Sequence, residues 1–215
     1  RGLGDVYKRQ QEGSIEMGKI FFISGKSSTG KDTIYKRLLE DKSLGFKKIT
    51  MYTTRPMRAG ESDGEEYFFV SNDEAKKHEH DGSIVEMRIY NTVYGPWKYY
   101  TRNDGQIDLD GNDNYLALGT IEAYGKYCEY FGKANVCPIY IEVDDGVRLG
   151  RALERERRQQ KPQYREMCRR FIADDDDFSE ENMKRCGIDR HFVNDNLEQC
   201  IEEIKTYICL LYTSP

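Results

Sequence analysis

The stretch "FISGKSSTGKDTIYKRL", residues 22–38, decides how this chain is expected to fold. It starts within a short apolar run, passes through a glycine-rich turn that ends in Gly-Lys, and continues with apolar residues at helical spacing. Strand, glycine-rich turn and helix, in that order, are the context in which the pattern G-x-x-x-x-G-K acts as a phosphate-binding loop. Such a loop directs backbone N–H groups and the positive end of a helix toward an anion. We therefore predict that Gly25 to Lys31 bind phosphate, the alternative being a strand-to-helix turn without a ligand.

Asp32 departs from the usual form of this loop, which has Ser or Thr at that position to ligate Mg²⁺. Thr33 follows directly and is a candidate to contact a phosphate. Asp32 itself has two readings. It can hold the metal through water, or it can favour the start of its own helix, where acidic residues are stabilising. The sequence leaves both readings open.

Composition limits the classes of function. The chain has 215 residues, a net charge of -5 and six cysteines, which suits a single domain. A mildly acidic protein is not expected to coat nucleic acid. We also expect no membrane partner, because no run approaches the roughly 18 apolar residues of a membrane-spanning helix. The cysteines form no C-x-x-C pair, which favours reduced thiols and a cytoplasmic location. The three histidines form no ligand set, so we assign no metal site to protein side chains.

Short apolar runs alternate with helical patterns along the chain. The runs that predict strands are 19–24, 46–54, 67–70, 83–90, 92–101, 114–119 and 137–143, and the helical patterns are 31–40, 71–80, 120–131, 146–159, 163–173 and 195–208. This alternation predicts a three-layer α/β fold with a central parallel sheet. Ser71 and Glu74 have the spacing of a capping box. We expect the run of four aspartates at 174–177 to be a solvated loop or a helix start.

A second motif, "TTRPMRAGESDGEEYFFVS" at residues 53–71, follows the phosphate loop. Taken together, the two motifs resemble guanylate kinases over roughly residues 17–208. The resemblance implies a P-loop NTPase fold with a monophosphate-binding lobe at 52–100 and a lid at 155–180. We interpret residues 1–16 and 209–215 as non-native flanks, because their sequence resembles translated adapter. The implied activity is transfer of phosphate from ATP, with Mg²⁺, to a nucleoside monophosphate, GMP first and dGMP next.

The resemblance also implies roles for individual residues. The ATP-binding set is Gly25, Ser27, Ser28, Thr29, Gly30, Lys31, Asp32, Thr33 and Asn194. The GMP-binding set is Arg55, Arg58, Glu61, Tyr67, Glu86 and Tyr94. The catalytic set is Lys31, Arg151, Arg155 and Arg170. Arginine forks suit phosphate oxygens, lid arginines stabilise the transferring phosphoryl group, and the matching Glu of the family accepts two hydrogen bonds from guanine. For the lid arginines the alternative is a solvated face paired with neighbouring glutamates.

Three positions depart from the family pattern. Pro96 and Met51 replace hydroxyl side chains, and Gly119 replaces an aspartate near the end of a strand. We interpret the chain as a divergent branch of the family. Two alternatives follow: a nucleoside monophosphate kinase with another acceptor base, and a non-catalytic guanylate kinase-like module that binds proteins. Retention of Lys31 argues against the second. The sequence does not specify the oligomeric state.

Overall fold

The centre of the molecule is a five-stranded sheet whose middle strand, β1 (Ile20–Ser24), leads into the phosphate loop. The computed structural model describes residues 18–58, 60–92 and 95–213. The strand order is β2-β7-β1-β8-β9, and all the pairings are parallel. The other strands of this sheet are β2 (Lys47–Lys48), β7 (Tyr115–Leu118), β8 (Val136–Glu142) and β9 (His191–Val193). The predicted α/β fold with a central parallel sheet is confirmed.

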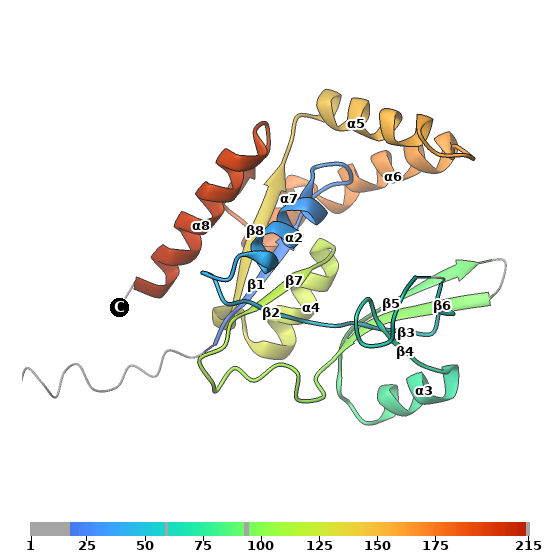
Figure 1. Ribbon diagram of the computed structural model, residues 1–215, viewed down its shortest axis with the longest axis vertical. Coiled ribbons are helices and arrows are strands. Elements are labelled where there is room, and N and C mark those ends of the chain that lie inside the picture. The colour runs from blue at the N-terminus through green and yellow to red at the C-terminus, as the bar shows by residue number, and fades with distance from the viewer. Residues whose placement is uncertain (1–17, 59, 93–94, 214–215) are drawn as a thin grey trace, which may run out of the picture.

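Helices cover both faces of this sheet (Figure 1). Successive side chains of a strand point to opposite faces, so Phe22 packs with α4 (Ile121–Phe131) and α7 (Glu180–Cys186) on one face. Phe21 packs on the other face with α2 (Lys31–Glu40) and α8 (Leu197–Thr213). Both faces of β1 are therefore buried, which is why its sequence is a continuous apolar run rather than an alternating one.

A second sheet, with the strand order β4-β3-β6-β5, forms the small lobe. Its elements are β3 (Tyr52–Thr53), β4 (Phe68–Phe69), α3 (Asn72–His80), β5 (Ile84–Thr92) and β6 (Gly95–Arg102). Tyr52 and Tyr100 stack with ring centroids 5.3 Å apart and pack with Ala75. The predicted capping box is confirmed, because Ser71 and Glu74 exchange both of its hydrogen bonds at the start of α3.

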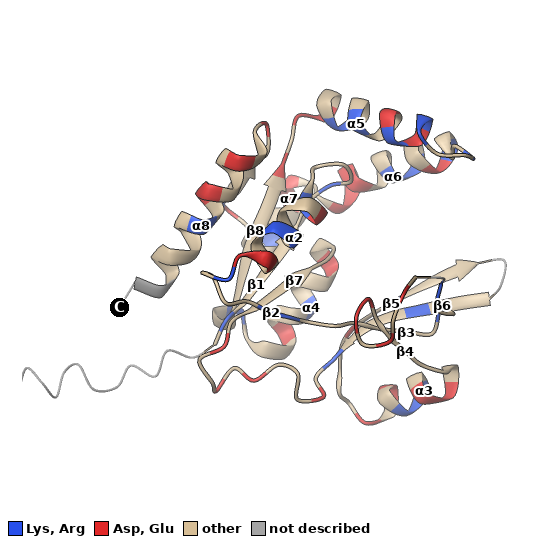
Figure 2. Cartoon of the chain, viewed as in Figure 1, with Lys and Arg blue, Asp and Glu red and all other residues tan. Residues whose placement is uncertain are grey.

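Helices α5 (Asp145–Arg157) and α6 (Tyr164–Asp177) form a hairpin that includes much of the predicted lid. In Figure 1 this hairpin and the small lobe extend to the same side of the core sheet, the hairpin above and the lobe below. Figure 2 shows basic and acidic residues interleaved along both helices of the hairpin. Within residues 18–58, 60–92 and 95–213, no helix is long and apolar enough to cross a membrane.

The structure differs from the sequence-based expectations in several elements. The run 46–54 is not one strand: β2 belongs to the core sheet and β3 to the lobe, so residues 49–51 carry the chain between them. Helix α7, strand β9 and a 3₁₀ turn at Lys133–Asn135 lie where no element was predicted. Helix α8 continues five residues past 208, the predicted end of the domain, and Leu211 packs against the apolar cluster beneath it.

Candidate active site

The phosphate loop has the strained backbone that its sequence suggests. Gly30 precedes α2 with a left-handed φ of 87°. Ser28 has a φ of 67°, which side-chain-bearing residues rarely adopt and which persists only where surrounding structure enforces it. The Thr29 hydroxyl donates to the Lys26 carbonyl oxygen at 2.9 Å and closes the turn. Among the described residues, no partner binds the buried hydroxyls of Ser24, which ends β1, and Ser28, which lies in the loop.

Asn194 supports this loop from below. Its side-chain Nδ2 donates to the Thr29 carbonyl oxygen at 2.7 Å, and its own backbone N–H donates to the Glu142 carbonyl at 2.8 Å. A Cβ at Gly30 would lie 2.5 Å from Asn194 Nδ2, so glycine is required for this close approach. The sequence predicted an ATP-binding role for Asn194. In the structure its side chain contacts the loop itself and holds the loop's shape.

Asn194→Ala is expected to reduce the free energy of unfolding by about 1–3 kcal/mol, because the buried Thr29 carbonyl loses its partner. Denaturant titration measures this change. Asn91→Ala, an exposed position in the lobe, is the matched control and should change stability by less than about 0.5 kcal/mol. A similarly small effect at Asn194 would show that the loop does not depend on this bond.

A cavity of about 480 Å³ joins the phosphate loop to the small lobe. The phosphate loop and α2 contribute Gly25, Ser27, Lys31 and Asp32 to its lining. The lobe side contributes Met51, Glu66, Tyr67, Arg88, Tyr90 and Tyr99. The remaining polar wall includes Gly119, Thr120, Tyr127, Asp174 and Asp177. One space therefore has a phosphate-binding loop at one end and an aromatic, polar lobe at the other. This arrangement can hold two ligands with their phosphates facing each other.

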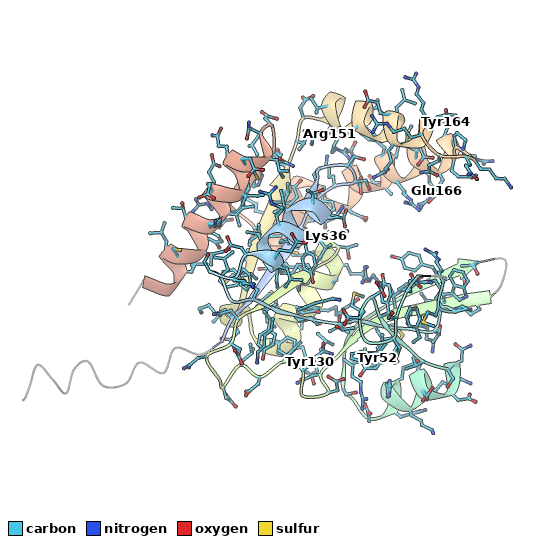
Figure 3. The ribbon with its side chains drawn as sticks, in the orientation of Figure 1. Lys36, Tyr52, Tyr130, Arg151, Tyr164 and Glu166 are labelled. Carbon is cyan, nitrogen blue, oxygen red and sulfur yellow. The ribbon has the colours of Figure 1, made fainter. Side chains whose placement is uncertain are left out.

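Two of the three predicted lid arginines lie beside the loop. Arg155 and Arg170 line a smaller cavity of about 160 Å³ together with Ser27 and Ser28. Glu166 holds Arg170, whose Nε donates to it at 2.9 Å. Arg151 instead donates to the Asn194 carbonyl oxygen at 3.2 Å, and Figure 3 shows it on α5, separate from Glu166 on α6. Arg155 and Arg170 thus share a cavity with the phosphate loop, whereas Arg151 contacts the backbone of Asn194.

Arg148 and Asp174 are site residues that the sequence did not identify. Arg148 is 1% exposed and bridges the loop to α6: its Nη1 donates to the Ser27 carbonyl at 3.2 Å and to Asp174 at 3.0 Å. The Asp174 carboxylate also accepts the Ser27 backbone N–H at 2.7 Å. The expectation of a solvated loop or a helix start is therefore wrong: residues 174–177 end α6, and the Asp174 side chain is only 14% exposed. The three-residue spacing from Asp145 to Arg148 was the available signal for the arginine.

Asp174 places a negative charge on a phosphate-loop amide. Asp174→Asn keeps the shape of the side chain and removes the charge, so we expect the KM for ATP to fall by several fold, since a unit charge at about 4 Å is worth about 1 kcal/mol in water. Initial rates at varied ATP concentration measure this change. Asp176→Asn, an exposed position of the same run, should leave the KM for ATP unchanged. A higher KM in Asp174→Asn would mean that the carboxylate orders the loop for ATP.

The predicted phosphate-binding arginines of the lobe differ in their surroundings. Arg55 is buried, and its guanidinium makes two hydrogen bonds to Glu61, at 2.8 and 3.0 Å. Arg55 and the backbone N–H of Arg58 hold the pKa of Glu61 below its usual range. The Arg58 side chain is exposed, whereas Tyr67 lines the cavity of about 480 Å³. Glu61 thus positions Arg55, and Tyr94 lies outside the described residues.

Glu86 is paired within the protein rather than open to a ligand. Arg88 Nε donates to one of its oxygens at 3.2 Å, and the Thr101 hydroxyl donates to the other at 3.2 Å. The Glu86 side chain is 3% exposed, and burial raises the pKa of this carboxyl above its usual range. Arg88, and not Glu86, is among the residues lining the cavity. This geometry differs from the expectation that the Glu86 carboxylate itself faces a base.

The site fits a magnesium ion only as part of a nucleotide complex. Among the described residues, no group of three or more His, Cys, Asp or Glu side chains is placed to hold a metal. Magnesium commonly keeps several waters and takes one or two carboxylates plus substrate phosphates, and Asp32 lines the cavity at the start of α2.

At Gly119, a Cβ would lie 2.8 Å from the Phe22 ring, so the family's aspartate has no room here. Thr33 is exposed, and its backbone N–H donates to Gly30.

Comparison with known proteins finds similarity to guanylate kinases. The model of the family "Guanylate kinase" matches residues 17–112. A curated guanylate kinase from Mesomycoplasma hyopneumoniae (strain 7448) is 26% identical over 201 residues, which cover 90% of this chain and 95% of that protein. The crystal structure of guanylate kinase from Anaplasma phagocytophilum has the same fold, with a TM-score of 0.59 at 22% identity over 93% of this chain and 88% of that one. Over residues 17–112 the chain is similar to guanylate kinases, and its fold is that of a guanylate kinase.

Proposed function

We propose that this protein is a nucleoside monophosphate kinase that transfers the terminal phosphoryl group of ATP to GMP, or to dGMP, and releases ADP and the diphosphate. The observation that carries the proposal is the single cavity that joins Lys31 of the phosphate loop to Tyr67 of the lobe. The similarity of the chain to guanylate kinases supports the same activity.

In this proposal the protein positions two phosphates and stabilises the charge that moves between them. The loop N–H groups and Lys31 hold the ATP phosphates, and Arg155 and Arg170 contact the transferring group from the lid. Arg55, Arg58 and Tyr67 hold the monophosphate. No side chain needs to act as a general base, because the acceptor phosphate is already a nucleophile once it is aligned. Magnesium bound with ATP would supply charge neutralisation, and Asp32 is a carboxylate of the cavity lining that could help to hold it.

Side-chain contacts attach the lid hairpin to the phosphate loop. Arg148 and Asp174 join α5 and α6 to the phosphate loop, so movement of the hairpin is mechanically coupled to the loop that holds ATP. Closure of such lids excludes water, which would otherwise accept the phosphoryl group. We also propose a cytoplasmic location, which is supported by the six free cysteines.

A kinase with another acceptor base is the second candidate, and Met51 and Pro96 favour it because they stand where the family has hydroxyl side chains. The third candidate, a non-catalytic protein-binding module, is disfavoured by Lys31 and its place in the cavity.

A coupled assay of ADP release with GMP, dGMP, AMP, CMP and UMP tests the proposal. We expect GMP to have the largest kcat/KM, with the other bases lower by about 10²–10³, or roughly 3–4 kcal/mol. This ratio of kcat/KM values is smaller than the largest ratios seen for sites that read a base by hydrogen bonds, because Met51 and Pro96 replace two hydroxyls. A larger kcat/KM with AMP or a pyrimidine monophosphate would select the second candidate, and no turnover with any acceptor would select the third.

A further inference from the structure

On the lobe side of the cavity, the Glu86 carboxylate is paired within the protein. Both carboxylate oxygens of Glu86 already accept hydrogen bonds, from Arg88 and Thr101. The Tyr127 hydroxyl donates in turn to the Thr101 hydroxyl at 2.9 Å, so the carboxylate ends a buried hydrogen-bonded chain. Releasing it to a ligand would break these bonds and leave Arg88 without its partner, which is costly for a buried charge pair.

Arg88 is placed to meet a ligand in place of Glu86. It lines the cavity together with Met51, Tyr67 and Tyr99, and its side chain is 22% exposed. Its Nε and Nη2 atoms donate hydrogen bonds within the protein. Nη2 donates to Glu86 at 3.4 Å and to the Met51 sulfur at 3.7 Å. Among the described residues, no acceptor is bonded to Nη1. A guanidinium has five N–H donors and no acceptor, so this wall of the cavity offers donors.

We propose that Arg88 is the residue that determines base specificity, and that it recognises the 6-oxo and N7 acceptors of a purine rather than the N1–H and 2-amino donors. The proposal rests on the proposed monophosphate kinase activity and names the edge of the base that is read. Arginine paired with O6 and N7 of guanine is the commonest specific contact between a side chain and a base. The 2-amino group then has no recognition partner, so the substrate class is 6-oxopurine monophosphates, IMP as well as GMP.

The charge arrangement explains why adenine is rejected. Adenine presents an amino group at C6, and this donor would face the N–H donors of Arg88. In the opposite arrangement, with a free carboxylate, the site would require the two donors of guanine and would reject IMP. The two arrangements therefore predict opposite behaviour toward the 2-amino group, although both accept GMP and exclude AMP.

Two analogues separate these arrangements. IMP keeps the 6-oxo group and lacks the 2-amino group, whereas 2-aminopurine riboside 5′-monophosphate keeps the amino group and lacks the oxo group. We expect the kcat/KM for IMP to lie within 10-fold of that for GMP. The 2-aminopurine analogue should be about 5- to 150-fold poorer than GMP, the range for one bidentate contact. A preference for GMP over IMP of 10-fold or more would overturn the proposal and leave GMP kinase activity intact.

Arg88→Ala should change the ratio of kcat/KM for GMP to that for IMP, a quantity that a purely structural role of Arg88 would leave unchanged. The substitution frees the Glu86 carboxylate toward the cavity, so the ratio of kcat/KM for GMP to that for IMP should rise, with IMP losing more. Lys98→Gln, which removes a cation of the same lobe paired with Glu79, should leave this ratio unchanged. An equal loss for both substrates in Arg88→Ala would count against the proposal.

Failure of the kinase activity is distinguishable from failure of this inference. If GMP is not phosphorylated, the proposed function fails, and calorimetric titration of the protein with GMP, IMP and AMP still decides which edge is read. Comparable binding of GMP and IMP, both tighter than AMP, would support Arg88 as the reader. Binding of GMP 10-fold or more tighter than IMP would overturn it.

Discussion

Lys31→Ala is expected to lower kcat by at least about 10²–10³ while the protein stays folded, because removal of one preorganised charge stabiliser commonly costs that much. Lys31 is the cation of the phosphate loop that lines the cavity shared with the lobe, and it lies at the start of α2, where the helix end adds positive potential. The charge that develops between the two terminal phosphates of ATP would lose its nearest protein cation. Steady-state kinetics with saturating ATP and GMP measure the loss.

The matched control for Lys31 lies on the same helix. Lys36 is exposed on α2 and is labelled in Figure 3, and Lys36→Ala should retain near-normal turnover. Circular dichroism and melting temperature establish that both variants are folded. Near-normal turnover in Lys31→Ala would mean that the loop is structural here, and the protein-binding module would become the better account.

Arg155→Ala is expected to lower kcat by about 10²-fold with a smaller change in the KM for GMP. Arg155 lies with Ser27 and Ser28 around the small cavity between the lid and the phosphate loop. A guanidinium at this place stabilises the transition state more than the bound substrates, because charge spreads over the equatorial oxygens of the transferring group. Arg155→Lys should recover only part of the rate, since an ammonium does not reproduce the planar fork of arginine.

Arg158 offers a control at the end of the same helix. Its side chain is 83% exposed, and its nearest acidic partner is Glu154 at 3.7 Å. Surface pairs of this kind contribute little to stability, so Arg158→Ala should be close to the parent protein in both rate and stability. An equal loss in Arg155→Ala and Arg158→Ala would point to general charge effects of the lid rather than contact with phosphate.

The parts of the fold that the sequence predicted are those with a strong local pattern. The run Lys19–Ser24, followed by Gly25 and Lys31, predicted the central strand, the loop and helix α2, and the helix bounds agree with the pattern. Elements with weak patterns were missed. Helix α7 is short and buries Met183, and β9 has three residues that are defined by pairing with β8 rather than by composition.

The candidate site divides in the same way. Residues whose role follows from a local motif, such as Lys31 and Tyr67, do lie on the cavity. Contacts between residues far apart in the chain had no sequence signal. The Asp174 carboxylate accepts the Ser27 backbone N–H across 147 positions. The pairing of Arg88 with Glu86 is local instead, because the two residues lie two positions apart on β5, where that spacing puts side chains on one face. The contact of Asp174 with Ser27 depends on how the lid helices pack on the phosphate loop. Which of Glu86 and Arg88 lines the cavity depends on how the two side chains pack in the lobe.

The most direct test of the central claim is the product composition of a mixture of this protein, ATP, Mg²⁺ and GMP, followed by ³¹P NMR. The account predicts that GDP and ADP appear in equal amounts, that neither appears without GMP, and that Lys31→Ala slows the appearance of both by at least about 10²–10³. Release of ADP without GDP, or an unchanged mixture at high protein concentration, would contradict the claim that this cavity transfers a phosphoryl group to GMP.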